Sequence, residues 1–154
     1  MDYPYLIIPI TVLITSNILK LVIAGIKGNL TLKNIFITYG GMPSSHTSFA
    51  VSITTLIGLR LGFDTPIFAA CLVFTLLIIR DAVNFRNILG KIGQVFNRLV
   101  EQLPAAERQA APVLPERTGH NLIEVSVGAI WGIGITYFLN LFWTQLHHII
   151  QTLP

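Results

Sequence analysis

Charged residues are scarce in this chain of 154 residues. Lys, Arg, Asp and Glu together make up 11% of it, whereas ordinary soluble domains carry about 25%. Hydrophobic residues make up 53%, and the mean hydropathy is +0.69. A soluble domain of this length could not bury so much apolar surface in a single core. The composition therefore excludes an ordinary soluble domain and indicates a protein embedded in a membrane.

Cysteine is nearly absent as well. Cys71 is the only one and lies within an apolar run, which excludes a disulfide framework and a thiolate metal site. Internal repeats and low-complexity tracts are also missing, and the length is that of one domain covering residues 1–154. The net charge of +3 is modest, and we expect the lipid bilayer, not nucleic acid, as the partner.

Four apolar segments predict an all-α integral membrane helical bundle with about four transmembrane helices. They cover about residues 5–26, 44–61, 66–85 and 121–143. A helix needs about 20 apolar residues to cross a bilayer, so the second segment is short for a full crossing.

The region between the third and fourth segments has a different pattern. Over about residues 87–103, apolar residues recur at helical spacing with polar residues between them. This pattern predicts one amphipathic helix that lies on the membrane surface or folds over the site as a cover. Three prolines mark residues 104–119 as a loop. In the last apolar segment, Gly128 and Gly132 permit close approach of another helix backbone.

Basic residues are concentrated on one side of this topology. Four crossings place residues 27–46 and 80–120 together, and most of the Lys and Arg residues lie in these two stretches. The positive-inside rule assigns that face to the cytoplasm, as expected for a protein of an inner or cytoplasmic-type membrane. Lys and Arg residues that serve to bind an anion would also raise the number of basic residues on this face.

Polar residues that are rare at membrane depth are predicted to converge on this face. An ionisable residue in an apolar segment is energetically costly and is a functional candidate by default. The candidates are Lys20, Ser44, Ser45, His46, Arg80, Asp81, His120 and Glu124.

The stretch Gly40–Ser48 (GGMPSSHTS) reads as a turn that opens an apolar helix. Ser44 or Ser45 can cap that helix, and its backbone N–H groups and positive dipole end can bind an anion. His46, held there, can donate a proton to a leaving oxygen. The alternative is that this stretch only caps a helix.

His120 and Glu124 are four residues apart, so they share one helix face. The carboxylate can hold one imidazole nitrogen protonated and leave the other as a nucleophile. With His46 as an acid, this is the arrangement that phosphoryl transfer through a phosphohistidine needs. Alternatively, His120 is a solvated interfacial histidine, and Arg80 and Asp81 are an ion pair that ends a helix.

The sequence Pro43-Ser44-Ser45-His46 resembles the Pro-Ser-Gly-His motif of the type 2 phosphatidic acid phosphatase superfamily, which includes vanadium haloperoxidases and bacterial acid phosphatases. The order of motifs resembles the short divergent membrane branch of that superfamily, from about Lys20 to Gly132.

Two further motifs match in part. Lys20 and Lys27 have the spacing of the superfamily's first motif, with Lys in place of Arg. His120 and Glu124 match the second half of its last motif, with Glu in place of Asp. The Ser-Arg half is absent, and Val113-Leu114 stands at its place.

The resemblance implies a role for each candidate. His120 would be the nucleophile, Glu124 its orienting partner and His46 the general acid. The phosphate would be held by Lys20, Lys27, Ser44 and Ser45. The missing arginine could be replaced by Arg117, Arg80 or Arg86, and Asp81 could support the site. Neither a metal nor a cofactor is required, because the lysines and the helix terminus supply positive charge.

Two functions follow as alternatives. The first is a membrane phosphatase that hydrolyses a lipid or prenyl phosphate or diphosphate. The second is a non-catalytic protein that binds lipid phosphate or another anion, or serves as a scaffold, and retains the superfamily fold. Four crossings, instead of the six usual in integral members, leave less protein around a lipid substrate. A homo-oligomer could complete the site.

Overall fold

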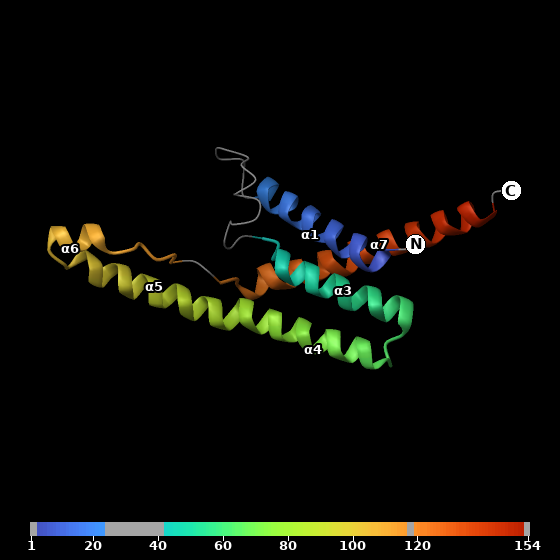
Figure 1. Cartoon of the computed structure of the whole chain (residues 1–154), viewed down its shortest axis with the longest axis horizontal. Coiled ribbons are helices and arrows are strands. Elements are labelled where there is room, and N and C mark those ends of the chain that lie inside the picture. The colour runs from blue at the N-terminus through green and yellow to red at the C-terminus, as the bar shows by residue number, and fades with distance from the viewer. Residues whose placement is uncertain (1–2, 24–41, 117–118, 153–154) are drawn as a thin grey trace.

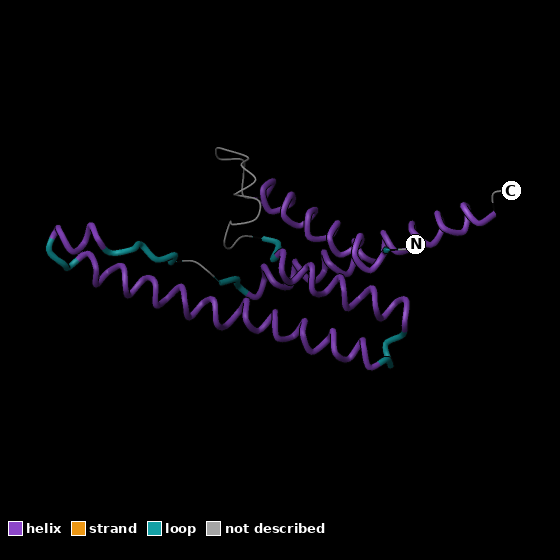
Figure 2. The backbone as a smooth tube through the Cα atoms, in the orientation of Figure 1, coloured by secondary structure: helices purple, strands orange, loops and turns teal. Residues whose placement is uncertain are grey.

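The computed structural model describes residues 3–23, 42–116 and 119–152, and every regular element in these ranges is a helix (Figures 1 and 2). The predicted all-α class is confirmed. In chain order the elements are α1 (Pro4–Ile23), α3 (Ser45–Leu61), α4 (Pro66–Arg80), η1 (Asp81–Phe85), α5 (Arg86–Glu101), α6 (Ala105–Ala110) and α7 (Leu122–Thr152).

Helix α3 is the centre of a bundle and packs against α1, α4 and α7. Small residues allow the closest of these contacts. A Cβ atom added to Gly128 would lie 2.7 Å from the backbone oxygen of Ser44, and one added to Gly132 would lie 2.6 Å from that of Ser48. The backbones of α7 and α3 therefore touch, as the two glycines predicted.

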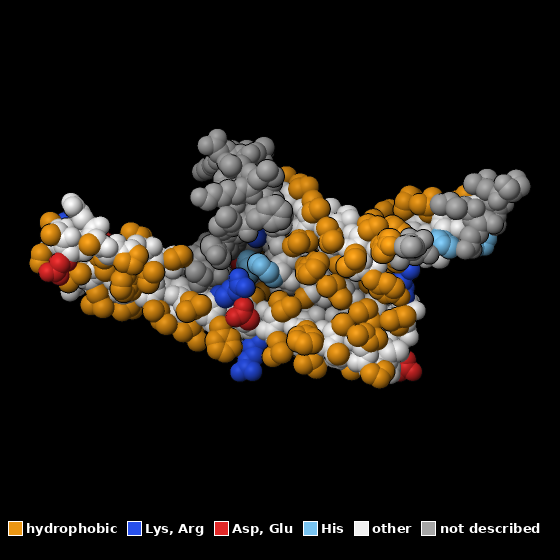
Figure 3. Space-filling model, viewed as in Figure 1, with side chains coloured by type: hydrophobic (Ala, Val, Ile, Leu, Met, Phe, Trp, Pro, Cys, Tyr) orange, Lys and Arg blue, Asp and Glu red, His pale blue; other side chains and the backbone are white. Residues whose placement is uncertain are grey.

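The interior of the bundle is unusually polar. On α1, buried residues recur every four positions, from Ile8 and Val12 to Ser16 and Lys20. Buried hydroxyls bond across helices, as between Thr136 of α7 and Ser52 of α3, whose oxygens are 2.6 Å apart. Large apolar side chains cover the outside instead (Figure 3). This inverted distribution is expected where lipid, not water, surrounds the protein.

Among the described helices, three are long and apolar enough to cross a membrane: Pro4–Ile23, the unbroken helix Pro66–Glu101, and Leu122–Ile149. The chain is thus an integral membrane helical bundle. Helix α3 has 17 residues, or about 25 Å, and is shorter than the roughly 30 Å hydrocarbon core of a bilayer.

Helices α4 and α5 form one continuous rod through η1, and α5 extends away from the bundle (Figure 1). Thr65 begins the rod: its side chain accepts a hydrogen bond from the N–H of Phe68, and Pro66 fits the first turn. The predicted amphipathic helix is present, but α5 continues the line of α4 and does not fold back over the bundle as a cover.

Two predicted boundaries need correction. The stretch 104–119 was expected to be a loop, but it contains α6, because its Ala-rich start favours a helix directly after Pro104. The predicted helix 121–143 continues as α7 to Thr152, since neither glycine nor proline interrupts residues 144–152. The predicted helix 5–26 is present as α1, and residues 24–26 of the prediction lie outside the described residues.

Candidate functional site

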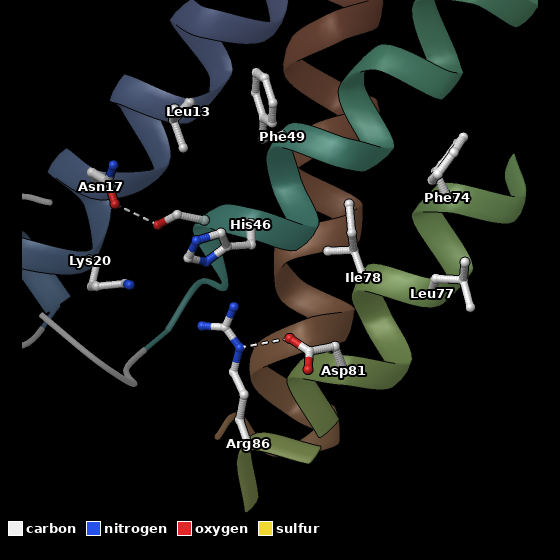
Figure 4. A pocket seen from close by; sticks show the side chains of 11 residues that line it. Leu13, Asn17, Lys20, His46, Phe49, Phe74, Leu77, Ile78, Asp81 and Arg86 are labelled. Atoms are coloured by element: carbon white, nitrogen blue, oxygen red, sulfur yellow. Dashed lines mark hydrogen bonds and ion pairs between the residues drawn. The ribbon is translucent and has the colours of Figure 1, made fainter. Parts of the chain in front are cut away.

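A cavity of about 610 Å³ lies between α1, α3 and the junction of α4 with α5. It has two chemically different parts (Figure 4). Polar side chains gather at one end: Asn17, Lys20, Ser45, His46, Asp81 and Arg86. The remainder is apolar and is lined by Leu13, Phe49, Phe74, Leu77 and Ile78. Figure 3 shows basic, acidic and histidine side chains close together where the bundle meets α5.

The last turns of α1 contribute two polar residues to this cavity. Lys20 is buried, with 9% of its surface exposed, and Asn17 lies one turn before it. The side-chain oxygen of Asn17 accepts a hydrogen bond of 2.6 Å from the hydroxyl of Ser45. This bond joins the end of α1 to the beginning of α3.

Helix α3 begins at the cavity with Ser44 as its N-cap residue, but the predicted capping by a serine side chain is not formed. The side chain of Ser44 makes no capping hydrogen bond. Its Oγ atom accepts a bond from the hydroxyl of Thr47 (3.0 Å), and its backbone N–H donates to the carbonyl of Glu124 (3.0 Å). Ser45 and His46, the first residues of α3, nevertheless bring the positive end of the helix to the cavity.

A π-helical turn, η1, aligns two charged residues of the cavity. The backbone N–H of Arg86 bonds to the carbonyl of Asp81, five residues earlier. The two side chains consequently meet, with Arg86 Nε 2.9 Å from Asp81 Oδ2. In an α-helix, residues five apart point about 140° away from each other. Figure 4 shows the guanidinium group of Arg86 directed toward Lys20 and His46.

The same turn holds the backbone of His120. The N–H of His120 donates to the carbonyl of Ala82 (3.0 Å), and its own carbonyl accepts a bond from Asn87 Nδ2 (3.1 Å). Gly119 lies so close to Asn87 that a Cβ atom would collide with it. The position of His120 is therefore set by η1 and the first turn of α5.

The side chains of His120 and Glu124 form a buried pair. Their exposed fractions are 4% and 6%, and the Nδ1 atom of His120 lies 2.8 Å from Glu124 Oε2. Glu124 also helps to cap the start of α7. Its carboxylate accepts a hydrogen bond from the backbone N–H of Asn121, and its own backbone N–H donates to the side chain of Asn121. Glu124 thus has a structural contact as well as the histidine contact.

Burial lowers the pKa of His120 below its ordinary value of 6.5, because a buried charge loses solvation. The hydrogen bond and charge of Glu124 act in the opposite direction and raise this pKa, but burial is the larger effect. His120, which precedes α7, is therefore a neutral imidazole at neutral pH. Glu124 accepts the Nδ1 proton, so Nε2 carries the lone pair.

The predicted candidates do not all lie in the cavity. His120 and Glu124 do not line it, but Lys20 and Arg86, which do, are near enough to act electrostatically on His120. Ser44 is completely buried beside α7.

Among the remaining predicted candidates, Arg80 is exposed and does not line the cavity. Lys27 and Arg117 lie outside the described residues.

Two residues of the site region were not predicted. Asn17 could have been found from its sequence, since it is polar, lies in an apolar segment and shares a helix face with Lys20. Asn87 carries no such signal, because its contact with His120 joins segments 33 residues apart.

The model of the divergent PAP2 family matches residues 1–135 of this chain. The chain belongs to this family. It is also 30% identical over 141 residues to the uncharacterized membrane protein YuiD of Bacillus subtilis (strain 168), an alignment that covers 84% of this chain and 89% of the relative. No solved structure matches the chain. The predicted resemblance to the divergent membrane branch of the superfamily is therefore confirmed.

Proposed function

We propose that this divergent PAP2 family member is a membrane phosphatase that hydrolyses a lipid or prenyl phosphate or diphosphate through a phosphohistidine. The observation that carries the proposal is the two-part cavity, in which an end with the basic residues Lys20 and Arg86 adjoins an apolar part. A phosphate group fits the basic end, where Lys20, Arg86 and the first turn of α3 supply positive charge. An alkyl or prenyl chain fits the side lined by Phe49 and Phe74.

In the first step, the Nε2 lone pair of His120 attacks phosphorus. The bond from nitrogen to phosphorus forms as the bond from phosphorus to the alkoxide oxygen breaks, and His46 gives its proton to that oxygen. Two observations support these roles: Glu124 holds Nδ1 of His120, and His46 lies in the polar end of the cavity. The step requires His120, which does not line the cavity, to reach a phosphate held beside Lys20 and Arg86.

In the second step, water attacks the phosphohistidine. His46, now neutral, accepts a proton from this water, phosphate leaves, and both histidines return to their starting states. The positive groups around the cavity stabilise the charge that develops on the phosphoryl oxygens in both steps. Glu124 keeps the His120 ring in one orientation and one tautomer.

The test is release of inorganic phosphate by the purified protein in detergent, with a panel of lipid and prenyl phosphates and with EDTA present. We expect turnover in the wild type and its loss in His120→Ala and His46→Ala. Folding is checked for each variant by circular dichroism and thermal unfolding. Full activity in folded His120→Ala would overturn the proposal.

A second candidate function is phosphate or lipid-phosphate binding without hydrolysis. It is favoured by two observations: His120 is buried outside the cavity lining, and Glu124 already makes hydrogen bonds at the start of α7. Binding of phosphate by the wild type without turnover of any substrate in the panel would select this candidate.

Two further proposals concern the sidedness of the site and the assembly of the protein. We keep as proposals that the site faces the cytoplasm, from the distribution of basic residues, and that a homo-oligomer completes the wall around the substrate. Labelling of a single cysteine introduced beside the cavity in intact cells tests the first, and the mass of the detergent-solubilised complex tests the second.

A further inference from the structure

We propose that Arg86, carried by the π-helical turn η1, is the arginine that contacts the phosphate in this site. It would supply the charge that the absent Ser-Arg half of the last motif would otherwise provide. The inference rests on the proposed function for the identity of the ligand, a phosphate group, but it does not require that the phosphate be hydrolysed.

The geometry favours Arg86 over Arg80, and Arg117 lies outside the described residues. Arg86 lines the cavity, and its guanidinium group is directed toward Lys20 and His46 (Figure 4). Arg80 is exposed and does not line the cavity. Arg86 also acts electrostatically on His120. A cation beside both histidines is where the phosphoryl group needs one while it moves from the alkoxide oxygen to His120.

The π-helical register is what places this arginine. In an α-helix, the N–H of Arg86 would bond to the carbonyl of Ala82. Here it bonds to the carbonyl of Asp81, while the carbonyl of Ala82 accepts the N–H of His120. One turn thus directs Arg86 into the cavity and fixes the backbone of His120. Turns of this kind occur frequently at functional sites.

Asp81 acts as a positioning residue for Arg86. Its carboxylate lies 2.9 Å from the Nε atom, at the base of the guanidinium group. This leaves the far end of the group directed into the cavity, as Figure 4 shows. A planar guanidinium held in this way suits a bidentate contact with phosphate oxygens, which an ammonium group cannot make.

The first experiment is titration calorimetry of inorganic phosphate with the full-length protein in detergent. We expect Arg86→Ala to weaken phosphate binding about tenfold or more and Arg86→Lys to weaken it less, because Lys keeps the charge but not the fork. The matched control is Arg98→Ala, an exposed arginine of the same helix that does not line the cavity, and it should bind as the wild type does. Wild-type affinity in Arg86→Ala, or a larger loss in Arg80→Ala, would overturn the proposal.

A second variant tests the register. Asn84 is exposed within η1, and insertion of one alanine after it would rotate the following helix by about 100°. We expect phosphate binding to fall as far as in Arg86→Ala. Retention of wild-type affinity in the insertion variant would overturn the role of the turn, and if the variant does not fold, the Arg86 substitutions still decide the proposal.

Asp81→Asn tests the positioning role. We expect a several-fold rise in the phosphate Kd, and in KM if substrate is turned over, with kcat nearly unchanged and partial rescue by Asp81→Glu. An unchanged Kd in Asp81→Asn would overturn this role.

The outcomes separate this inference from the proposed function. Phosphate binding that depends on Arg86, without turnover, would support the inference and refute the phosphatase. Turnover together with unchanged binding and kinetics in Arg86→Ala would support the phosphatase and refute the inference. Absence of phosphate binding in the wild type would refute the inference.

Discussion

The bundle and the α5–α6 extension, which we call the arm, hide their polar groups in different ways. In the bundle, small residues let α3 and α7 touch, and buried hydroxyls bond across the contact. In the arm, the polar face of α5 is held by residues 111–116. Both ends of the Asn97 amide bond to the backbone of Leu114, at 2.9 and 3.0 Å.

The opposite face of the arm is apolar and exposed. Ile88, Ile92, Val95 and Leu99 are each more than half exposed and border a shallow apolar groove. The bundle is therefore stabilised by packing of helix against helix, whereas the arm is stabilised by a few hydrogen bonds to one passing segment. The candidate site lies where the two regions join, at η1. Site chemistry should therefore depend on the bundle and on η1, but not on the far part of the arm.

The largest expected effect separates the site from the arm. His46→Gln should lower kcat for phosphate release by about 10²- to 10⁴-fold, because it removes the proposed general acid. Asn97→Ala, in the arm, should leave kcat unchanged. Steady-state kinetics on the best substrate of the panel measures both. Equal losses in the two variants would show that the arm takes part in the reaction.

The next effect concerns packing in the bundle. Gly132→Ala would place a Cβ atom 2.6 Å from a backbone oxygen of α3, so we expect a loss of about 1–3 kcal/mol from overpacking. Gly134→Ala is the matched control, since nothing lies within 4 Å of its added Cβ, and it should be neutral or stabilising. Thermal unfolding in detergent compares the two. Equal midpoints would mean that α3 and α7 can separate without cost.

The pH dependence of kcat/KM tests the protonation state assigned to His120 at the end of the bundle where the site lies. His120 must be neutral to attack, and burial lowers its pKa below 6.5, so the acid limb of kcat/KM should fall below that pH. Glu124 raises the pKa of His120, so Glu124→Gln should move the acid limb to still lower pH as well as reduce the rate. A limb that moves to higher pH would contradict the assignment of His120 as nucleophile.

The smallest effect lies in the arm. Asn97→Ala removes the two bonds to Leu114 and a third to the side chain of Glu116. We expect amide hydrogen exchange to rise about tenfold in residues 111–116 and to stay unchanged in α3, since each lost hydrogen bond contributes about 1 kcal/mol. Faster exchange throughout the bundle would show that the arm and the bundle unfold together.

Several features of the fold could be predicted because they depend on neighbours along the chain. Apolar runs indicated the helices, and the spacing of Gly128 and Gly132 indicated a close helix contact. Ser44 is the N-cap residue of α3, but the side-chain cap was wrong because the hydroxyls of Ser44 and Ser45 bond to the side chains of Thr47 and Asn17. The helix α6 was missed because prolines on both sides suggested a loop, although the six residues that form it favour a helix.

The sequence by itself determined that this is a membrane protein, that its class is all-α and that it resembles the divergent branch of its superfamily, because composition, hydrophobic runs and short motifs are properties of the chain alone. Only the tertiary structure decided which basic residues share a cavity. Arg86 and Asp81 meet through a π-helical turn that no periodicity announces, and His120 is fixed by carbonyl and amide groups of a segment more than 30 residues away. Such contacts arise from helix packing, and a single sequence does not record them.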